Sequence, residues 1–393
     1  MKSLSQIMSS LPLPVKSVVI TVATLLFSHV LVYDLMSVSF FSPMEKASDF
    51  RFSDFYTIVA DDRAVSTLDD DIVIVPVDGL TRKEIAHTLD AIDFYEPAAI
   101  GFDIAFAPPS NPDDDPLAES LAGCENLVMP IRISSDDEGV HAEHLSYYDD
   151  IVTPKGGFAA VNIQGDAKER ATVREFTRSF ETNEGEVPSL PFALISIARP
   201  EAAKKFAARP QKEEFIKFAS REFDIITPDE VAENPDLIKD KIVLVGKIQN
   251  AGDLHVTPLD NFTPGLKIHA QIAATMLSGE FIRELTPFES YAIAAITCFL
   301  IVWLNMRLWD SPAGPLVVRI VQMILLYAMI MGGTMAYIYL NIDLNFAFAI
   351  LATSLGVAGC DIYIGLFTKN GACDRIENFF KKSIKPSLNK PSL

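Results

Sequence analysis

Apolar residues are concentrated in four long runs, one near the N-terminus and three near the C-terminus: Val15–Tyr33, Phe288–Trp309, Leu316–Leu340 and Leu344–Phe367. Short polar segments, DSPAGP and NID, separate the last three runs. A helix rises about 1.5 Å per residue, so about 20 apolar residues cross the roughly 30 Å hydrocarbon layer of a membrane. The pattern therefore predicts four transmembrane helices around a long middle segment.

The first apolar run is either a cleaved signal peptide or an uncleaved anchor. No small-x-small cleavage site follows it, and Asp34–Phe41 stays largely apolar, which favours the anchor. Short loops rich in Lys and Arg stay in the cytoplasm, and three such clusters flank the apolar runs. Their members are Lys2, Lys16, Arg307, Arg319, Lys369, Arg375, Lys381, Lys382, Lys385 and Lys390. We expect both termini in the cytoplasm and the middle segment on the other side of the membrane.

The middle segment alternates short apolar runs with helical patterns. DIVIVPVD (Asp71–Asp78) predicts a buried strand, Thr81–Tyr95 a helix, and AAIGFDIAF (Ala98–Phe106) a second strand. A strand, a helix and a strand in this order form a crossover with a parallel strand pair. Further helices are expected at Asp114–Cys124, at Ser189–Ala198 and, with a break at Pro210, at Glu201–Glu222. A further strand is expected at Lys241–Gly246. The segments GFAAVNI and VREFTRSF are expected to form two strands that pair antiparallel.

These elements predict an α/β extracytoplasmic domain with a largely parallel mixed sheet, plus four transmembrane helices, one N-terminal and three C-terminal. The expected layout is a cytoplasmic N-terminus at 1–14, transmembrane helices at 15–41, 287–309, 316–340 and 343–367, a periplasmic domain at 42–286, and a basic cytoplasmic tail at 368–393.

Charge and cysteine content narrow the function classes. The whole chain carries a formal charge of −19, and the middle segment holds nearly twice as many acidic as basic residues. Such a surface repels nucleic acid, so a nucleic-acid partner is excluded. The acidic charge is explained by a solvated envelope domain, because net charge determines solubility rather than fold. The four cysteines fall in different compartments, so the middle segment is held by its core rather than by disulfides.

Five segments carry a resemblance to a known family: IVPVD, AAIGFDIAF, DKIVLVG, DLHVTPL and PGLKIHAQIAATML, followed at once by three apolar runs. Their order and the one-plus-three arrangement of apolar runs resemble the cyclase/histidine-kinase-associated sensory extracellular domain of the second type, the CHASE-two family. The resemblance covers nearly the whole chain. It implies a periplasmic input domain of a bacterial receptor.

The sequence departs from the family pattern in two places. Receptors of this kind usually carry a cyclase or kinase after the last span, whereas only a short basic segment follows Phe367, so we expect no catalytic output domain. The family also has a Gly-Trp-Pro-Trp-type segment before an arginine of the first helix. Here the chain passes almost directly from Asp78 to Arg82, so any ligand pocket that this segment shapes is altered or lost.

Polar residues at strand ends form the candidate ligand site. Ligands of open parallel sheets bind outside the carboxyl ends of the strands. Asp78 and Asp103 lie at two such ends, Asp253 and His255 follow a third, and Arg82 follows Asp78 closely. A small-ligand rim, a metal site, and simple capping of turns and helices all remain open at this point, and we commit to no metal and no cofactor.

Two further groups of residues stand out. Pro264, Gly265 and His269 begin the last helix before the membrane, and we expect them at the junction between the folded domain and its membrane base. Arg319 and Asp361 are ionisable residues within apolar runs, where such groups pair, snorkel or mark a pathway. Small residues in the same runs suit bundle packing or oligomerisation.

Signatures of common enzymes are absent: the chain has no Gly-x-Ser-x-Gly, Walker-type loop, His-Glu-x-x-His or Cys-x-x-Cys. We therefore expect a non-catalytic protein. One hypothesis is a periplasmic sensor that binds a small molecule or a protein and relays this to a separate partner. The alternative is a structural anchor or scaffold subunit of an envelope complex. Either protein would contact the lipid bilayer and form a homo-oligomer or a complex with another envelope protein.

Overall fold

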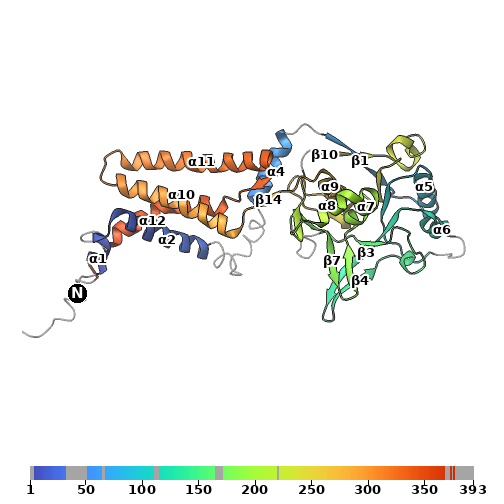
Figure 1. The fold of residues 1–393 in the computed structure, drawn as a ribbon, viewed down its shortest axis with the longest axis horizontal. Coiled ribbons are helices and arrows are strands. Elements are labelled where there is room, and N and C mark those ends of the chain that lie inside the picture. The colour runs from blue at the N-terminus through green and yellow to red at the C-terminus, as the bar shows by residue number, and fades with distance from the viewer. Residues whose placement is uncertain are drawn as a thin grey trace, which may run out of the picture. The chain divides into compact units, whose positions relative to one another are not determined.

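The computed structural model describes residues 4–31, 51–63, 67–109, 115–163, 171–218, 221–367, 372–373 and 375–376. The chain forms two compact units. One, here called the α/β unit, comprises Asp54–Ile282, and the other, the helical unit, comprises Met1–Ser53 and Arg283–Leu393. Figure 1 shows the elements of both units.

Within the described residues, the α/β unit is built on a seven-stranded sheet in the order β10-β1-β11-β2-β3-β4, with β5 also paired to β3. All strand pairs are parallel except β3 with β4. The strands are β1 (Thr67–Pro76), β2 (Ala99–Asp103), β3 (Leu127–Asp136), β4 (Gly139–His144), β5 (Phe158–Ala160), β10 (Arg221–Ile225) and β11 (Ile242–Gly246). The predicted mixed, largely parallel sheet is confirmed.

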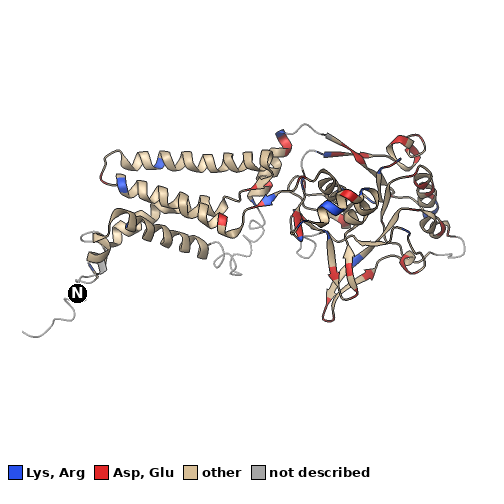
Figure 2. Cartoon of the chain, viewed as in Figure 1, with Lys and Arg blue, Asp and Glu red and all other residues tan. Residues whose placement is uncertain are grey.

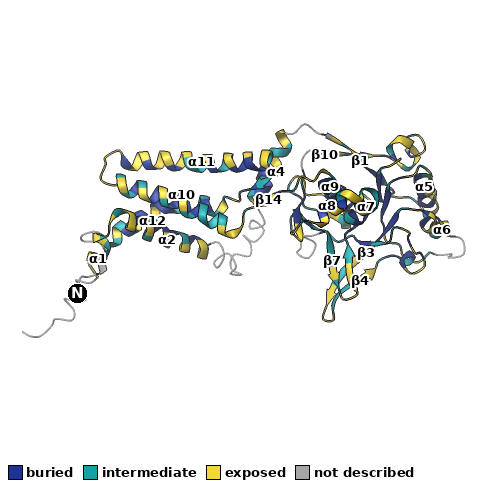
Figure 3. Ribbon diagram, in the orientation of Figure 1, coloured by how far each residue is buried: buried dark blue, intermediate teal, exposed yellow. Residues whose placement is uncertain are grey.

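Helices cover both faces of this sheet, because side chains of a strand alternate between the faces. Ile72 and Ile74 of β1 pack in one buried cluster, and Val73 and Val75 in the other. Figure 3 shows the central strands of the sheet as buried. The first cluster contains α7 (Leu190–Ala198), α8 (Pro200–Ala207) and α9 (Gly265–Ser278). The second contains α5 (Arg82–Phe94) and α6 (Pro116–Gly123). Continuous apolar strands are therefore buried on both sides.

Local signals determine where the first helix begins. Thr81 and Glu84 form a capping box at the start of α5, in which the Thr81 side chain accepts from the Glu84 backbone N–H and the Glu84 carboxylate accepts from the Thr81 backbone N–H. This arrangement satisfies backbone donors that have no partner inside the helix. Gly101 in β2 serves close packing, since a Cβ there would lie 2.7 Å from Leu194 Cδ1 and 2.8 Å from Leu244 Cδ2.

The region after β5 differs from the prediction. GFAAVNI and VREFTRSF do not pair with each other, because β5 joins β3 and β6 (Glu175–Thr177) pairs with β9 (Glu213–Phe215). The helix expected over Glu201–Glu222 is wrong beyond Ala207, where α8 ends. Phe215 and Ile216 are buried after β9 forms, so tertiary packing overrides the helical composition. β7 (Ser179–Thr182) and β8 (Gly185–Pro188) form a separate hairpin.

A buried ion pair fixes the first helix of the α/β unit. Asp54 of α4 (Phe52–Arg63) accepts from Arg174 in a bidentate pair, with Nε to Oδ1 at 2.6 Å and Nη2 to Oδ2 at 2.7 Å. Both residues are buried, each with a relative exposure of 7%. Buried pairs of this geometry are specific, because removing one partner leaves an uncompensated charge. The pair therefore ties α4 to the segment that leads into β6.

The helical unit holds three helices long and apolar enough to cross a membrane: α10 (Pro287–Leu308), α11 (Gly314–Leu340) and α12 (Ala347–Phe367). The N-terminal helix α2 (Leu13–His29) is apolar but shorter, and much of the predicted 15–41 span lies outside the described residues. Four spans therefore stay a prediction. The unit also contains α1 (Leu4–Ser10) and a short bridge of β14 (Arg283–Glu284) and β15 (Ile342–Asp343), while most of 368–393 is not described.

Small and hydroxylated side chains line the contacts inside the helical unit, whose described helices carry few charged residues (Figure 2). Buried Ser17, Thr21, Thr24 and Ser28 follow one face of α2. A Cβ added to Gly359 of α12 would lie 2.7 Å from Thr24 Oγ1, so the glycine allows the two helices to approach closely. Such contacts hold helices together where lipid removes the hydrophobic driving force between them.

Candidate functional site

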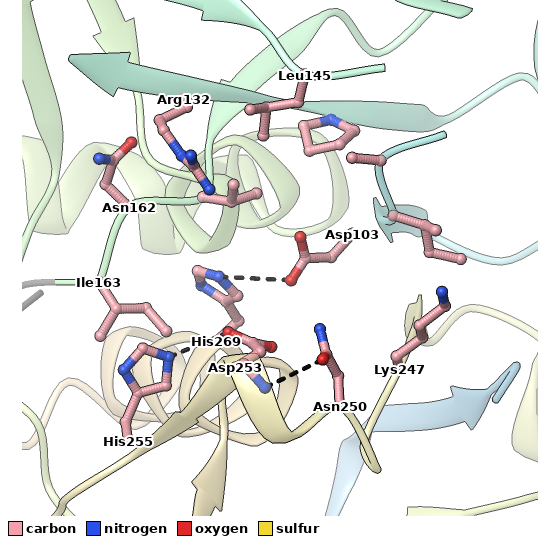
Figure 4. Close-up of a pocket in the computed structure, with 15 residues that line it drawn as sticks. Asp103, Arg132, Leu145, Asn162, Ile163, Lys247, Asn250, Asp253, His255 and His269 are labelled. Carbon is pink, nitrogen blue, oxygen red and sulfur yellow. Dashed lines mark hydrogen bonds and ion pairs between the residues drawn. The ribbon is translucent and has the colours of Figure 1, made fainter. Parts of the chain in front are cut away.

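A polar cavity of about 290 Å³ opens at the carboxyl ends of β2 and β11 (Figure 4). The cavity lies within the α/β unit and is lined by residues from β2, β3, β12 (Leu254–His255), α9 and the loops between them. Its polar side chains are those of Asp103, Arg132, Asn162, Lys247, Asn250, Asp253, His255 and His269. This is the edge at which open parallel sheets bind ligands.

Asp103 and His269 form the buried floor. Asp103 ends β2, and the His269 side chain, from the second turn of α9, has its Nε2 3.9 Å from Asp103 Oδ2. The His269 side chain is 2% exposed and that of Asp103 is 20% exposed. Burial, with a smaller contribution from the nearby Asp253 carboxylate, raises the pKa of Asp103 to about 7. Asp103 therefore changes charge near neutral pH.

Asp253 and His255 form a second acid–imidazole pair, with Asp253 Oδ1 and His255 Nε2 3.1 Å apart. The backbone holds this pair in place, since β12 pairs antiparallel with β13 (Thr263–Pro264). Gly265 follows β13 and begins α9, and a Cβ at this position would lie 2.7 Å from Asp253 Oδ1. A glycine is therefore required for the Asp253 carboxylate to approach the start of α9.

Two cationic side chains line the cavity as well. Arg132 lies on β3, and Lys247 directly follows β11. Both side chains are exposed, and among the described residues neither has a carboxylate within ion-pair distance. Asn162 is instead committed to the backbone, because its amide accepts from the Ile133 N–H at 2.6 Å and donates to the Ile133 carbonyl at 2.8 Å.

The structure separates Asp78 and Arg82 from the other candidate residues. The Asp78 carboxylate accepts from the backbone N–H groups of Ile248 and Gln249, each at 3.0 Å, and so anchors the loop after β11. Arg82 donates to the carbonyl of Ala107 and lies over the Phe106 ring, 5.2 Å from its centre. Neither residue lines the cavity, whereas Asp103, Asp253 and His255 do.

The predicted junction residues also belong to this region. Pro264 is the last residue of β13, Gly265 is the first residue of α9, and His269 lines the cavity. Their predicted role at the membrane junction stays a prediction. Sequence reasoning missed Arg132 and Lys247. Lys247 carries the same strand-end signal as Asp103, but Arg132 lies in the middle of a strand and gives no such signal.

In the helical unit, Arg319 Nη1 donates to Gln322 Oε1 at 3.1 Å, and Gln322 in turn donates to the Thr353 carbonyl at 2.9 Å. The side chains of Arg319 and Asp361 are exposed, and no ion pair joins them in the part of the chain that the structure describes. In the same described ranges, no group of three or more His, Cys, Asp or Glu side chains converges to hold a metal ion.

Outside the cavity, a second hollow of about 560 Å³ lies between α5 and α6. The acidic residues Asp90, Asp93 and Glu119 line it, together with Phe94, whose side chain is 78% exposed.

Comparison with known protein families identifies one match. The family model of the CHASE2 domain matches residues 17–305. The match begins in α2 and ends in α10, so it covers the whole α/β unit. No curated protein and no solved structure shows significant similarity to the chain.

Proposed function

The chain belongs to the CHASE2 family of sensory extracellular domains, and on this basis we propose that it is a non-catalytic membrane sensor that binds a small polar ligand in the β2/β11 cavity. The observation that supports the proposal most is the convergence of Asp103, Asp253 and His255 on one cavity at the carboxyl edge of the sheet. No nucleophile with a positioned base accompanies them in the described residues, which favours binding over catalysis.

The cavity has a direct route to the membrane helices along the chain. His269 of α9 lines the cavity, α9 ends at Ser278, and α10 begins at Pro287. A ligand that binds one position of α9 better than another shifts the populations of these positions. We propose that this shift passes through the segment after α9 to the membrane helices and from them to a separate partner protein.

The topology proposed here is a multi-pass protein of the bacterial inner membrane with both termini in the cytoplasm and the α/β unit in the periplasm. Impermeant maleimide applied to intact spheroplasts tests it. We expect Cys373 to react only after permeabilisation, and a cysteine introduced by Asp229→Cys, at an exposed position of the α/β unit, to react at once. The reverse labelling pattern would refute the topology.

The sensor function is tested by thermal unfolding of the full-length protein in mild detergent, with and without a panel of amino acids, sugars, organic acids and polyamines. A ligand that binds only the folded state raises the unfolding temperature in a concentration-dependent way. We expect such a rise for at least one compound, and its loss in Asp103→Asn. A panel without any effect would contradict the proposal.

A second candidate function is docking of another envelope protein, as expected for a scaffold or anchor subunit. The hollow between α5 and α6 favours it, because the exposed Phe94 lies among acidic residues that attract a basic partner surface. Purification of the tagged protein in mild detergent, followed by mass spectrometry, should then recover a companion in fixed ratio. Loss of that companion in Phe94→Ser, with an unchanged unfolding temperature, would assign the docking site.

A further inference from the structure

We propose that the cavity recognises a small zwitterion, a free amino acid or a molecule with the same pair of groups, whose ammonium pairs with Asp103 and Asp253 and whose carboxylate pairs with Arg132, with Lys247 as the second cation that lines the cavity. This inference rests on the proposed sensor function and names the chemical class of its ligand. It follows from the presence of two carboxylates and two permanent cations in one cavity.

The negative groups of the cavity are Asp103 and Asp253. Asp103 and Asp253 are close enough for the Asp253 charge to act on Asp103. In the described residues, each carboxylate has an imidazole as its ion-pair neighbour, and neither has Lys or Arg within that distance. An imidazole carries a charge only when it is protonated, unlike Lys or Arg. Two adjacent carboxylates without a permanent cation form a site that gains most from a ligand ammonium group.

The positive groups of the cavity are two exposed residues, Arg132 and Lys247. Figure 4 shows Arg132 and Lys247 on two sides of Asp103, on separate elements. Glu143 faces Arg132 across the β3–β4 ladder, but its carboxylate accepts from the Ser134 hydroxyl and is not within ion-pair distance of Arg132. A guanidinium and an ammonium that face a shared hollow provide the donors that a carboxylate requires.

The size of the cavity limits the ligand. Small-molecule sites typically measure about 300–1,000 Å³, and this cavity, at about 290 Å³, lies at the lower end of that range. Ile104, Leu145 and Ile163 add apolar surface beside the charged groups. The cavity therefore suits a compact molecule with a short side chain. A lining of both charges favours a zwitterion over dicarboxylates and diamines, each of which would leave one pair of charged side chains without a partner.

Thermal unfolding of the full-length protein in mild detergent tests this class directly. The probes are the standard amino acids, each with its N-acetyl derivative, which lacks the ammonium, and its amide, which lacks the carboxylate. Succinate and putrescine serve as like-charged probes, and sugars serve as uncharged probes. We expect saturable stabilisation by at least one amino acid and at least a tenfold weaker apparent affinity for both of its derivatives.

Three variants locate the effect. Asp103→Asn should weaken the apparent affinity at least tenfold for the amino acid and for its amide, both of which carry the ammonium. Arg132→Gln should weaken the apparent affinity at least tenfold for the amino acid and for its N-acetyl derivative, both of which carry the carboxylate. Asp229→Asn, at an exposed position outside the cavity, should leave the affinity unchanged. Because Arg132 is exposed and has no ion pair with a described residue, its replacement tests binding without the risk of unfolding the domain.

The outcomes separate the two proposals. Stabilisation by succinate, putrescine or a sugar, with no response to any amino acid, would overturn the zwitterion and leave the sensor function intact. No response to any probe would overturn both. An amino acid that still binds equally well in Asp103→Asn and Arg132→Gln would place its site outside this cavity and would overturn the zwitterion assignment.

Discussion

Replacing Asp103 with asparagine should stabilise the α/β unit at pH 8 and change its stability little at pH 4. Burial raises the pKa of this carboxyl from 3.8 to about 7. Between these two values the folded protein binds more protons than the unfolded chain, so the free energy of unfolding falls as the pH rises from about 4 to about 7. Asparagine does not ionise, and the variant therefore avoids this loss.

The magnitude follows from the size of the shift. About three pKa units at 1.36 kcal/mol each give an upper value of about 4 kcal/mol at pH 8, against about 0.6 kcal/mol at pH 4. The Asp103 side chain is 20% exposed, and partial hydration reduces the effect. We therefore expect a difference of about 2–3 kcal/mol at pH 8, or a rise of roughly 5–10 °C in the unfolding temperature.

Urea titrations of the full-length protein in mild detergent, followed by circular dichroism, measure this difference. Helices in detergent keep their internal hydrogen bonds, so the urea transition reports mainly the α/β unit. Asp90→Asn, at an exposed position on α5, is the matched control and should show no dependence of this kind. An equal change in stability at both pH values, or a loss of stability at pH 8, would refute the reasoning.

Three further variants test the packing of the α/β unit in the same titration. Asp54→Asn should lower the free energy of unfolding by about 3–5 kcal/mol, because Arg174 stays buried without its carboxylate. An equal loss in the double variant Asp54→Asn/Arg174→Met, which removes the buried charge, would contradict this. Thr81→Ala should lower the free energy of unfolding by about 1 kcal/mol and speed hydrogen exchange in the first turn of α5. Unchanged exchange rates in that turn would show that the capping box is dispensable. Gly101→Val should cost about 1–3 kcal/mol by overpacking against Leu194, and an unchanged midpoint would show that this contact yields freely.

Local elements of the α/β unit were predictable from the sequence, because their signals are local. The apolar run of β11, the helical pattern of Thr81–Tyr95 and the apolar run of α7 each predict the element that forms. The rule that ligands bind at the carboxyl ends of parallel strands also predicted that Asp103, Asp253 and His255 lie at one edge of the sheet, and they line the cavity there.

Long-range features were not predictable in this way. Phe215 is buried by a partner strand nearly 40 residues earlier in the chain, which no local pattern announces. Asp78 and Asp103 have the same strand-end signal, yet one anchors a loop and the other faces the cavity. The direction of a side chain at such an end depends on the loop that follows the neighbouring strand, and a single sequence does not specify that loop.

The position of β11 has a consequence for how the protein is made. β11 lies between β1 and β2, although roughly 140 residues separate β2 from β11 in the chain. During synthesis, β1 and β2 therefore keep the edges that face each other unpaired until β11, the last strand of the sheet in the chain, has been made. Lys247, Asp253, His255 and His269 all follow β11. The cavity is consequently completed in a single late step, and a nascent chain that stops before β11 has exposed edges for chaperones or proteases to recognise.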